Sequence, residues 1–196
     1  YTRVEALGIN KYFIESLSTY LSSIGIHHIK TREPGGTVVG EAIRDIFSRP
    51  PDDEPLSIEA EFLLISAARA QHVQQKIAPA LLNNIWVLCD RYVDSTAIYQ
   101  GYYNKFGVQK IYQLHKLLLN NFLPDLTFVF NNNPNIAKKR LLKRKNKNKY
   151  DKVDYKFNNK INSAFIKLAK KNSRFIIIDA TLSINEIHDI IISYLI

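Results

Sequence analysis

The chain has 196 residues, enough to bury the sizeable core of one domain. Hydrophobic residues make up 46% and charged residues 23%, as in an ordinary soluble globular protein. A single cysteine, Cys89, excludes an internal disulfide framework, and no apolar run approaches the length that spans a bilayer. No secretory signal is visible, so we expect a cytoplasmic protein with no membrane partner.

The alternation of apolar runs and amphipathic stretches predicts βαβ units and a parallel sheet. Strand-like runs lie near residues 3–6, 26–30, 85–89, 126–130 and 175–178. Helical patterns lie between them, at residues 11–23, 38–48, 57–83, 108–121, 134–145, 153–171 and 184–195. Ser183, with Glu186 three residues on, is a capping-box signature for the last helix.

The net charge of +9 is concentrated in one segment, because lysine and arginine crowd residues 138–152 with only Asp151 against them. Such a cluster favours polyanions, either nucleotide phosphates or nucleic acid. Aromatic residues are not interleaved with this basic cluster as a stacking platform would require, so nucleic acid is the less expected partner. The alternative is a solvated loop rich in Lys and Asn.

The most informative segment follows the apolar run at residues 85–89. There the chain reads Asp90-Arg91-Tyr92-Val93-Asp94-Ser95-Thr96-Ala97-Ile98-Tyr99-Gln100-Gly101. A buried parallel strand would deliver Asp90 to the carboxyl edge of a sheet, where ligands of open α/β sheets bind. Arg91 adds a fixed cation beside the carboxylate, as phosphoryl transfer requires. The alternative is a strand that ends in an ordinary surface ion pair.

A second segment follows the β-prone residues 26–29 and reads Thr31-Arg32-Glu33-Pro34-Gly35-Gly36-Thr37. Together the two segments resemble the thymidylate kinase family, nucleoside monophosphate kinases that phosphorylate dTMP. The family hallmarks are an Arg-Glu-Pro-Gly-Gly-Thr loop and an Asp-Arg-Tyr segment closed by Tyr-Gln-Gly, and both stand here intact and in order. The resemblance runs from about Val4 to the C-terminus.

This resemblance implies an α/β fold of the three-layer P-loop NTPase type, with five parallel strands in the order 2-3-1-4-5. It implies one domain over residues 1–196, a basic lid at about 138–152 and a homodimer. The implied reaction is transfer of the γ-phosphoryl group of ATP, with Mg²⁺ as cofactor, to dTMP. Two alternatives stay open: a catalytically impaired nucleotide-binding homologue, and a nucleic-acid-binding module that uses the basic segment.

The expected phosphate loop departs from the family pattern. The resemblance places the ATP phosphates on Gly8, Asn10, Lys11 and Tyr12. A P-loop needs backbone N–H groups around the phosphates, a Lys on the outer phosphates and a short hydroxyl on Mg²⁺. Here the loop is one residue short, and Tyr12 stands where the short hydroxyl residue belongs. We therefore interpret residues 5–12 as a degenerate P-loop, the alternative being that Lys11 is a solvated residue at a helix start.

The acceptor side is better preserved. The resemblance assigns dTMP to Glu33, Pro34, Arg44, Ile65, Arg69, Arg91, Thr96, Tyr99 and Gln100. Arginines suit phosphate because their planar fork binds two oxygens at once, and this role falls to Arg44 and Arg91. Arg69 matches the arginine that hydrogen-bonds a thymine carbonyl, and Thr96 and Tyr99 match residues that contact the base edge and the sugar.

Two details of the acceptor side can be compared with the family pattern. Pro34 stands where the family often has a cis peptide. Ile65 replaces the usual Phe that stacks on thymine, which forfeits on the order of 1–3 kcal/mol of stacking. Phe62 lies three residues earlier, so it could replace that ring only if the helix rotated.

The residues expected to carry catalysis are cations. They are Lys11, Arg91, Arg140 and Arg144. Ile9 stands where another branch of the family has an Arg, so the chain resembles the bacterial type, in which lid arginines neutralise the transferred group. Asp90 would help to organise Mg²⁺ through water.

Overall fold

The computed structural model describes residues 3–7, 11–51, 53–131 and 155–195. In the segment that begins at residue 11 the side chains are described from Phe13 onward, and in the segment that begins at residue 155 from Phe157 onward. Contacts divide the chain into two compact units, Tyr1–Thr127 and Phe128–Ile196. The helix expected at residues 134–145 and the whole of the lid expected at about 138–152 lie outside the described residues. That residues 1–196 act as one domain stays a prediction.

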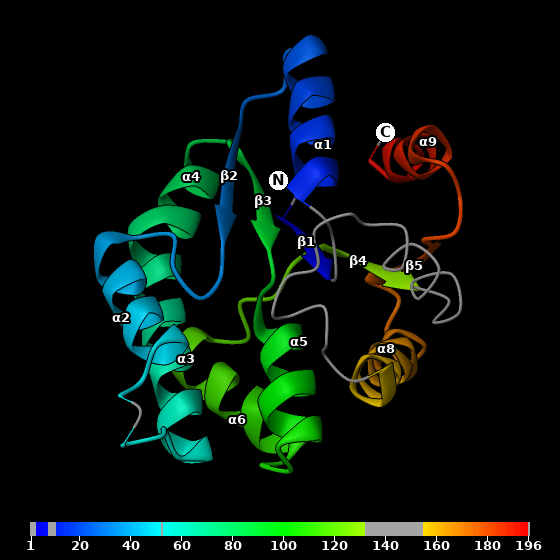
Figure 1. Ribbon diagram of the computed structural model, residues 1–196. Helices are drawn as coiled ribbons and strands as arrows, with labels where there is room; N and C mark the ends of the chain where they lie inside the picture. The colour runs from blue at the N-terminus through cyan, green and yellow to red at the C-terminus, as the bar shows by residue number, and fades with distance from the viewer. Residues whose placement is uncertain (1–2, 8–10, 52, 132–154, 196) are drawn as a thin grey trace. The chain divides into compact units, whose positions relative to one another are not determined.

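Five strands were expected, and the structure has them at the expected places. They are β1 (Arg3–Leu7), β2 (His28–Arg32), β3 (Trp86–Asp90), β4 (Leu126–Asn131) and β5 (Phe175–Asp179). Their order in the sheet is β2-β3-β1-β4-β5, which confirms the predicted order. Within the first unit, β3 pairs in parallel with both β1 and β2 (Figure 1).

The strand β3, which lies between β2 and β1 in the sheet, is buried on both faces, as parallel strands beneath helices usually are. Val87, Leu88 and Cys89 are 2%, 1% and 6% exposed. The apolar run is therefore explained by core packing, and Asp90 ends it at the carboxyl edge of the sheet.

The strand β2 presents its two faces to different helices, because successive side chains of a strand point to opposite sides. His28 Nε2 lies 2.7 Å from Ser18 Oγ, and Lys30 is paired with Glu15, so one face meets α1 (Lys11–Ser23). Thr31 on the other face meets His72, the last residue of α3 (Ile58–His72). The first unit thus has helices on both sides of β2.

The helices of the first unit agree with most of the predicted ranges. Besides α1 and α3 they are α2 (Val38–Ser48), α4 (Ala78–Leu82), α5 (Val93–Thr96) and α6 (Val108–Leu119), with π-helical turns η1 (Val73–Ile77) and η2 (Ala97–Tyr103). The predicted helix 57–83 is the run α3–η1–α4. Pro79 near the start of α4 lacks the N–H that an α-helical ladder needs, and the wide turn η1 directly precedes that helix.

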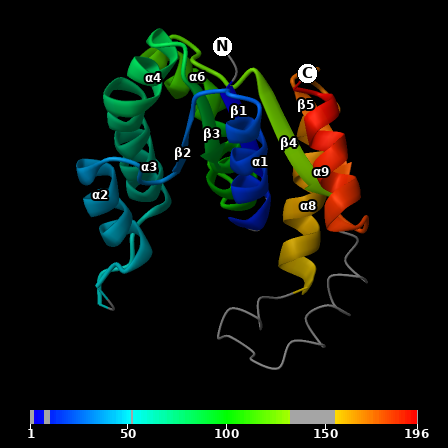
Figure 2. The same cartoon turned by 90° about the horizontal axis from the view of Figure 1, so that it is seen from above.

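The end of β2 leads into a capped helix. Thr37 is extended, and its side chain accepts a hydrogen bond of 3.0 Å from Gly40 N, which begins α2. The helix α2 lies beside α3 (Figure 2). The loop at residues 33–36 is thereby held between the strand edge and two packed helices.

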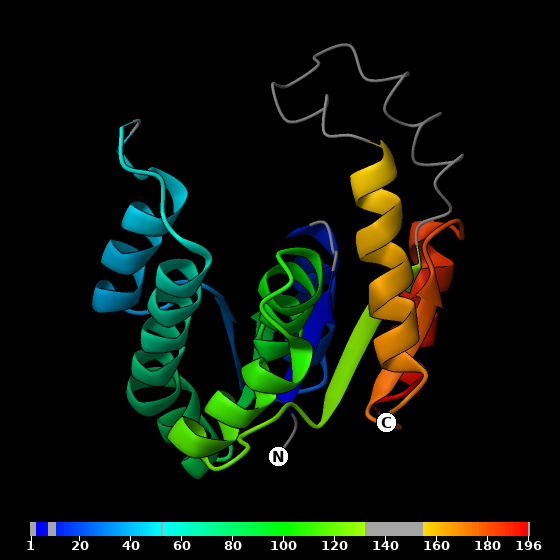
Figure 3. The ribbon, with the colours of Figure 1, turned by 90° about the horizontal axis from the view of Figure 1, so that it is seen from below.

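The second unit is a small βα arrangement of its own. The strand β5 packs against α8 (Tyr155–Ala169) and α9 (Ile184–Ser193), drawn in orange and red in Figure 3. The predicted capping box is confirmed, because Ser183 Oγ accepts from Glu186 N and the Glu186 carboxylate accepts from Ser183 N. In the part of the chain that the structure describes, no helix is long and apolar enough to cross a membrane.

Candidate active site

One pocket of the first unit collects the two sequence motifs at the carboxyl ends of β2 and β3. It measures about 440 Å³ including its open mouth and is lined by Glu33, Pro34, Phe47, Ile65, Arg69, Arg91, Tyr92, Ser95, Thr96, Tyr99 and Gln100. Every residue that was predicted to bind dTMP lines this pocket, except Arg44. The pocket therefore joins segments that lie as far as 67 positions apart in the chain, from Glu33 to Gln100.

Arg69 is fixed in the wall of the pocket, and only 3% of its side chain is exposed. Its Nε donates to Glu33 Oε2 at 2.7 Å, and its Nη2 donates to Thr96 Oγ1 at 2.7 Å. The Tyr92 ring lies under it, with 5.2 Å between Cζ and the ring centroid. Because a guanidinium is planar, these contacts set both its position and its plane.

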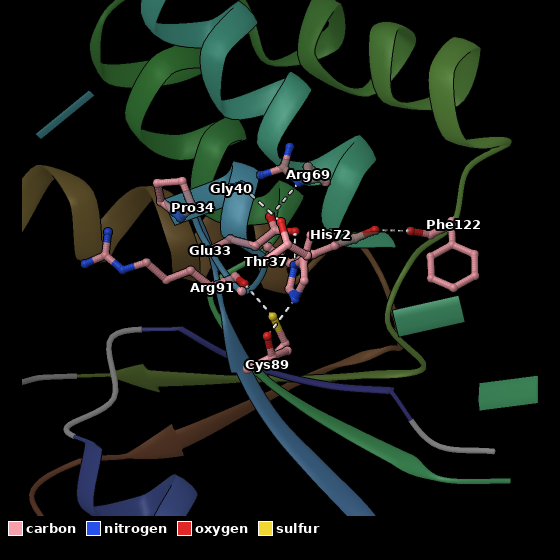
Figure 4. A network of polar contacts seen from close by, with 12 residues as sticks. Glu33, Pro34, Thr37, Gly40, Arg69, His72, Cys89, Arg91 and Phe122 are labelled. Atoms are coloured by element: carbon pink, nitrogen blue, oxygen red, sulfur yellow. Dashed lines mark hydrogen bonds and ion pairs between the residues drawn. The ribbon is translucent and has the colours of Figure 1, made fainter. Parts of the chain in front are cut away.

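Glu33 holds Arg69 and is itself held from behind (Figure 4). Its side chain is 2% exposed, and its Oε1 accepts a 3.1 Å hydrogen bond from His72 Nδ1. The other ring nitrogen of His72 lies 2.6 Å from Thr31 Oγ1. Both carboxylate oxygens of Glu33 thus bind groups of the protein, so Glu33 lines the pocket chiefly as a support for Arg69.

His72 and Thr31 were not predicted as parts of this network. A signal was present, because His72 stands three residues after Arg69 and so shares its helix face. The partner on the other side, Glu33, is 39 positions away, a contact that helical spacing does not reveal.

Three arginines influence the Asp90 carboxyl electrostatically at the edge of the sheet. Burial raises the pKa of the Asp90 carboxyl, while the charges of Arg91, Arg44 and Arg32 act to lower it. Burial lowers the pKa of Arg44, and the neighbouring charge of Arg32 lowers it further. Cations this close to one another favour an anion between them, which suits a phosphate.

The three arginines are held in different ways. Arg44 Nη1 donates to the carbonyl oxygen of Pro34 at 2.9 Å, which ties α2 to the loop. Arg32 pairs with Glu41 at 2.7 Å, and both side chains are about half exposed, at 49% and 43%. Arg91 has a left-handed backbone, with φ at 65°, and its Cζ lies 5.2 Å from the Tyr99 ring centroid. Arg32 was visible in the Arg-Glu-Pro motif but had no role assigned.

The loop after β2 is closely packed. The Glu33–Pro34 peptide is cis, as the resemblance predicted. Gly36 has φ at 82°, and a Cβ there would lie 2.5 Å from His72 Nε2 and 2.7 Å from Thr31 Oγ1. Glycine at this position therefore meets both a backbone need and a steric one.

The pocket wall at Ile65, where a base was expected to pack, also contains an aromatic residue, Phe47, to which no role was assigned. Ile65 lines the pocket as predicted, and so does Phe47 from α2. Phe62 does not replace the missing ring, because it is 4% exposed and packs against Phe106 with 4.9 Å between ring centroids. The aromatic side chains of this pocket are thus Phe47, Tyr92 and Tyr99.

Gln100 and Thr96 lie on a helix that the sequence analysis did not predict. The segment after Asp90 forms α5 and then the π-helical turn η2. The Gln100 amide donates to Glu61 Oε2 at 3.2 Å, which links η2 to α3. Ser95, in α5, lines the pocket and was also not assigned.

The donor side is only partly described. The helix α1 begins at Lys11, the residue at which the sequence predicts a helix start. Gly8 and Asn10 lie outside the described residues, as do the side chains of Lys11 and Tyr12. Arg140 and Arg144 also lie outside them. The roles given to these six residues stay predictions.

A second buried histidine lies behind the pocket. His115 is 4% exposed, and its Nε2 donates to the carbonyl oxygen of Phe122 at 3.0 Å. Burial lowers its pKa to about 4, and the charge of Arg69 acts in the same direction. Its ring packs edge-on against Tyr92 at 5.6 Å between centroids, so it supports the residue on which Arg69 rests.

This histidine should make stability depend on pH. A folded pKa of about 4 lies below the ordinary value of 6.5, so the unfolded chain binds the proton more tightly. The contribution is fully present above about pH 6.5 and is lost as the pH falls to about 4, on the order of 3 kcal/mol in all. We expect urea unfolding to show this loss. His115→Gln keeps a donor for the Phe122 carbonyl and should flatten the profile in this window; an unchanged profile would contradict the assignment.

Comparisons with known proteins agree with this geometry. The family model described as thymidylate kinase matches residues 12–191. A thymidylate kinase from Sulfurihydrogenibium sp. (strain YO3AOP1) is 39% identical over 183 residues, covering 93% of this chain and 88% of the relative. One from Orientia tsutsugamushi (strain Ikeda) is 44% identical over 152 residues, covering 74% and 68%.

A solved structure is similar over nearly the whole chain. The crystal structure of thymidylate kinase from Ehrlichia chaffeensis has a TM-score of 0.77 and 28% sequence identity, and the match covers 99% of this chain and 97% of that one. The α/β architecture is therefore that of the P-loop nucleoside monophosphate kinases. With the family model matching most of its length, the chain belongs to the thymidylate kinase family.

Proposed function

We propose that this chain transfers the γ-phosphoryl group of ATP to the 5′-phosphate of dTMP, giving dTDP. The observation that carries the proposal is the pocket itself, which places Arg69 in its wall and Arg91 at the edge of the sheet beside Asp90. The impaired homologue and the nucleic-acid-binding module are not favoured, because curated relatives that match most of the chain are named as the kinase.

The acceptor is held at its two ends. Arg69, fixed by Glu33 and Thr96, donates a hydrogen bond to a carbonyl of the thymine ring. At the other end, Arg91 and Arg44 bind the 5′-phosphate, where their charges meet around Asp90. Tyr99 packs on the sugar between them. Each contact holds dTMP in one orientation toward the donor, and positioning of this kind supplies much of the rate of phosphoryl transfer.

Magnesium fits the residues at the edge of the sheet. Mg²⁺ takes oxygen ligands, keeps several waters and commonly uses one or two carboxylates together with substrate phosphates. The Asp90 carboxylate would reach such an ion through water; burial raises the pKa of this carboxyl, and the charges of Arg91, Arg44 and Arg32 act to lower it. When bound, the ion neutralises charge on the ATP phosphates. Arg91 does the same for the transferred group from the acceptor side.

The donor contacts are proposed from the resemblance. Gly8, Asn10, Lys11 and Tyr12 would meet the ATP phosphates, and Arg140 and Arg144 would neutralise the transferred group. A homodimer and a cytoplasmic location complete the proposal. The first experiment is to measure dTDP formation from dTMP in the presence of ATP and Mg²⁺; absence of dTDP would overturn the proposal.

Binding should discriminate among nucleotides. We expect calorimetric titration to give a lower Kd for dTMP than for UMP or AMP, because Arg69 and Thr96 meet a pyrimidine edge while Tyr99 disfavours a 2′-hydroxyl. A site that hydrogen-bonds its ligand penalises analogues that leave its buried polar groups unpaired. Equal affinity for all three nucleotides would overturn the acceptor assignment.

A further inference from the structure

His72 lies behind the pocket and does not line it, yet it joins the end of β2 to the pocket wall. Its side chain is completely buried. Its two ring nitrogens have different partners, Glu33 Oε1 at 3.1 Å for Nδ1 and Thr31 Oγ1 at 2.6 Å for Nε2. A buried ring with two specific partners is able to fix the side chains on both sides of it.

The direction of one hydrogen bond follows from chemistry. An ionised carboxylate only accepts, so Nδ1 carries the hydrogen and donates to Glu33. The second carboxylate oxygen accepts from Arg69 Nε at 2.7 Å. Glu33 is thus held by two donors, one on each oxygen, and Arg69 takes its orientation from a carboxylate that His72 has already oriented.

The backbone of Glu33 is fixed, so only the contacts of its side chain can change its orientation. Its backbone N–H donates to the carbonyl oxygen of Asp90 at 2.9 Å, which fixes the start of the side chain. What remains free is rotation about the side-chain bonds. Without a donor at His72, one buried oxygen of Glu33 would lack its partner, and a buried acceptor without a partner favours a different rotamer.

We propose that His72 is a positioning residue for base recognition, acting through Glu33 on Arg69. This rests on the proposed function, in which Arg69 hydrogen-bonds the thymine ring. The contact of Nδ1 orients the Glu33 carboxylate, while the contact of Nε2 to Thr31 only holds the ring in place beside Gly36. Base recognition therefore depends on a residue that never touches the ligand.

Two substitutions separate the two nitrogens of the ring. The amide nitrogen of Asn stands near the position of Nδ1, and that of Gln stands near the position of Nε2. His72→Asn therefore keeps a donor for Glu33, while His72→Gln keeps only a partner for Thr31. Both replace a buried ring by an amide, and Asn, which is one methylene shorter, removes more volume from the core than Gln does.

The readout is Kd by calorimetry for two ligands, dTMP and 2-deoxyribose 5-phosphate, which lacks the base. We expect His72→Gln to raise the Kd for dTMP by about 10- to 100-fold, since it deprives a buried charged group of a hydrogen bond. We expect His72→Asn to stay within about threefold of the native chain for dTMP. The Kd for 2-deoxyribose 5-phosphate should change in neither, because the phosphate contacts come from Arg44 and Arg91.

Three outcomes would overturn the inference: an unchanged Kd for dTMP in His72→Gln, equal losses in the two variants, or a matching loss for the ligand without a base. If His72→Gln does not fold, Glu33→Gln serves instead. Its amide presents a donor to Arg69 or to His72, and it should weaken dTMP alone. Failure of the proposed function is seen separately, in a native chain that forms no dTDP or binds dTMP no better than AMP.

Discussion

Replacing Arg91 by Lys is expected to lower kcat by about 10²- to 10³-fold, the scale observed when one preorganised donor is removed from a transition state. A guanidinium binds two phosphate oxygens in one plane, whereas an ammonium is a point charge. The backbone gives no separate reason for a loss, because φ at 65° is a left-handed conformation that strains Arg and Lys alike. The measurement is the rate of dTDP formation at saturating ATP and dTMP.

The matched control for this change is Arg49→Lys. Arg49 is exposed, pairs with Asp45 one helical turn away and does not line the pocket. It should leave kcat unchanged, and both variants should unfold close to the native midpoint. If Arg91→Lys turns over at the native rate while folded, Arg91 does not bridge the acceptor phosphate and the transferred group.

Arg69→Met should cost the most stability of any change in the pocket, about 3–5 kcal/mol in the free energy of unfolding. Methionine fills much of the same space, but the Glu33 carboxylate, 2% exposed, would lose the guanidinium that compensates its charge. Urea unfolding measures the loss. Affinity for dTMP should fall as well, because the donor to the thymine carbonyl is removed.

A second variant tests the cause of this loss. In the double substitution Glu33→Gln with Arg69→Met, no uncompensated charge is buried, so part of the stability should return. Arg49→Met is the exposed control and should cost little, since surface ion pairs contribute about 0–1 kcal/mol. A loss in Arg69→Met no larger than in Arg49→Met would show that the buried pair does not stabilise the fold.

The sequence was sufficient for the elements whose pattern is local. The strands and the helices at residues 11–23 and 38–48 have the expected periods, and the structure confirms them. The helical structure of the segment after Asp90 was not predicted, because α5 has only four residues and η2 does not follow the α-helical period.

The site was predictable where a side chain stands in a motif and not where it acts from a distance. Arg69, Thr96 and Tyr99 were found by resemblance, and all three line the pocket. His72 was missed because its role depends on Glu33, which approaches it only when β2 and α3 are packed. Long-range polar contacts of this kind are set by tertiary structure, which a single sequence does not display.

The register between β2 and β3 limits which changes in length the loop at residues 33–36 can accept. Arg32 lies opposite Asp90, and the hydrogen bond from Glu33 N to Asp90 O continues the ladder one residue beyond the end of β2. An inserted residue in β2 would exchange its faces, turning Thr31 toward α1 and Lys30 toward α3. An insertion or deletion here would therefore disrupt both faces of the strand at once, and relatives should conserve the length of the segment from β2 to Pro34.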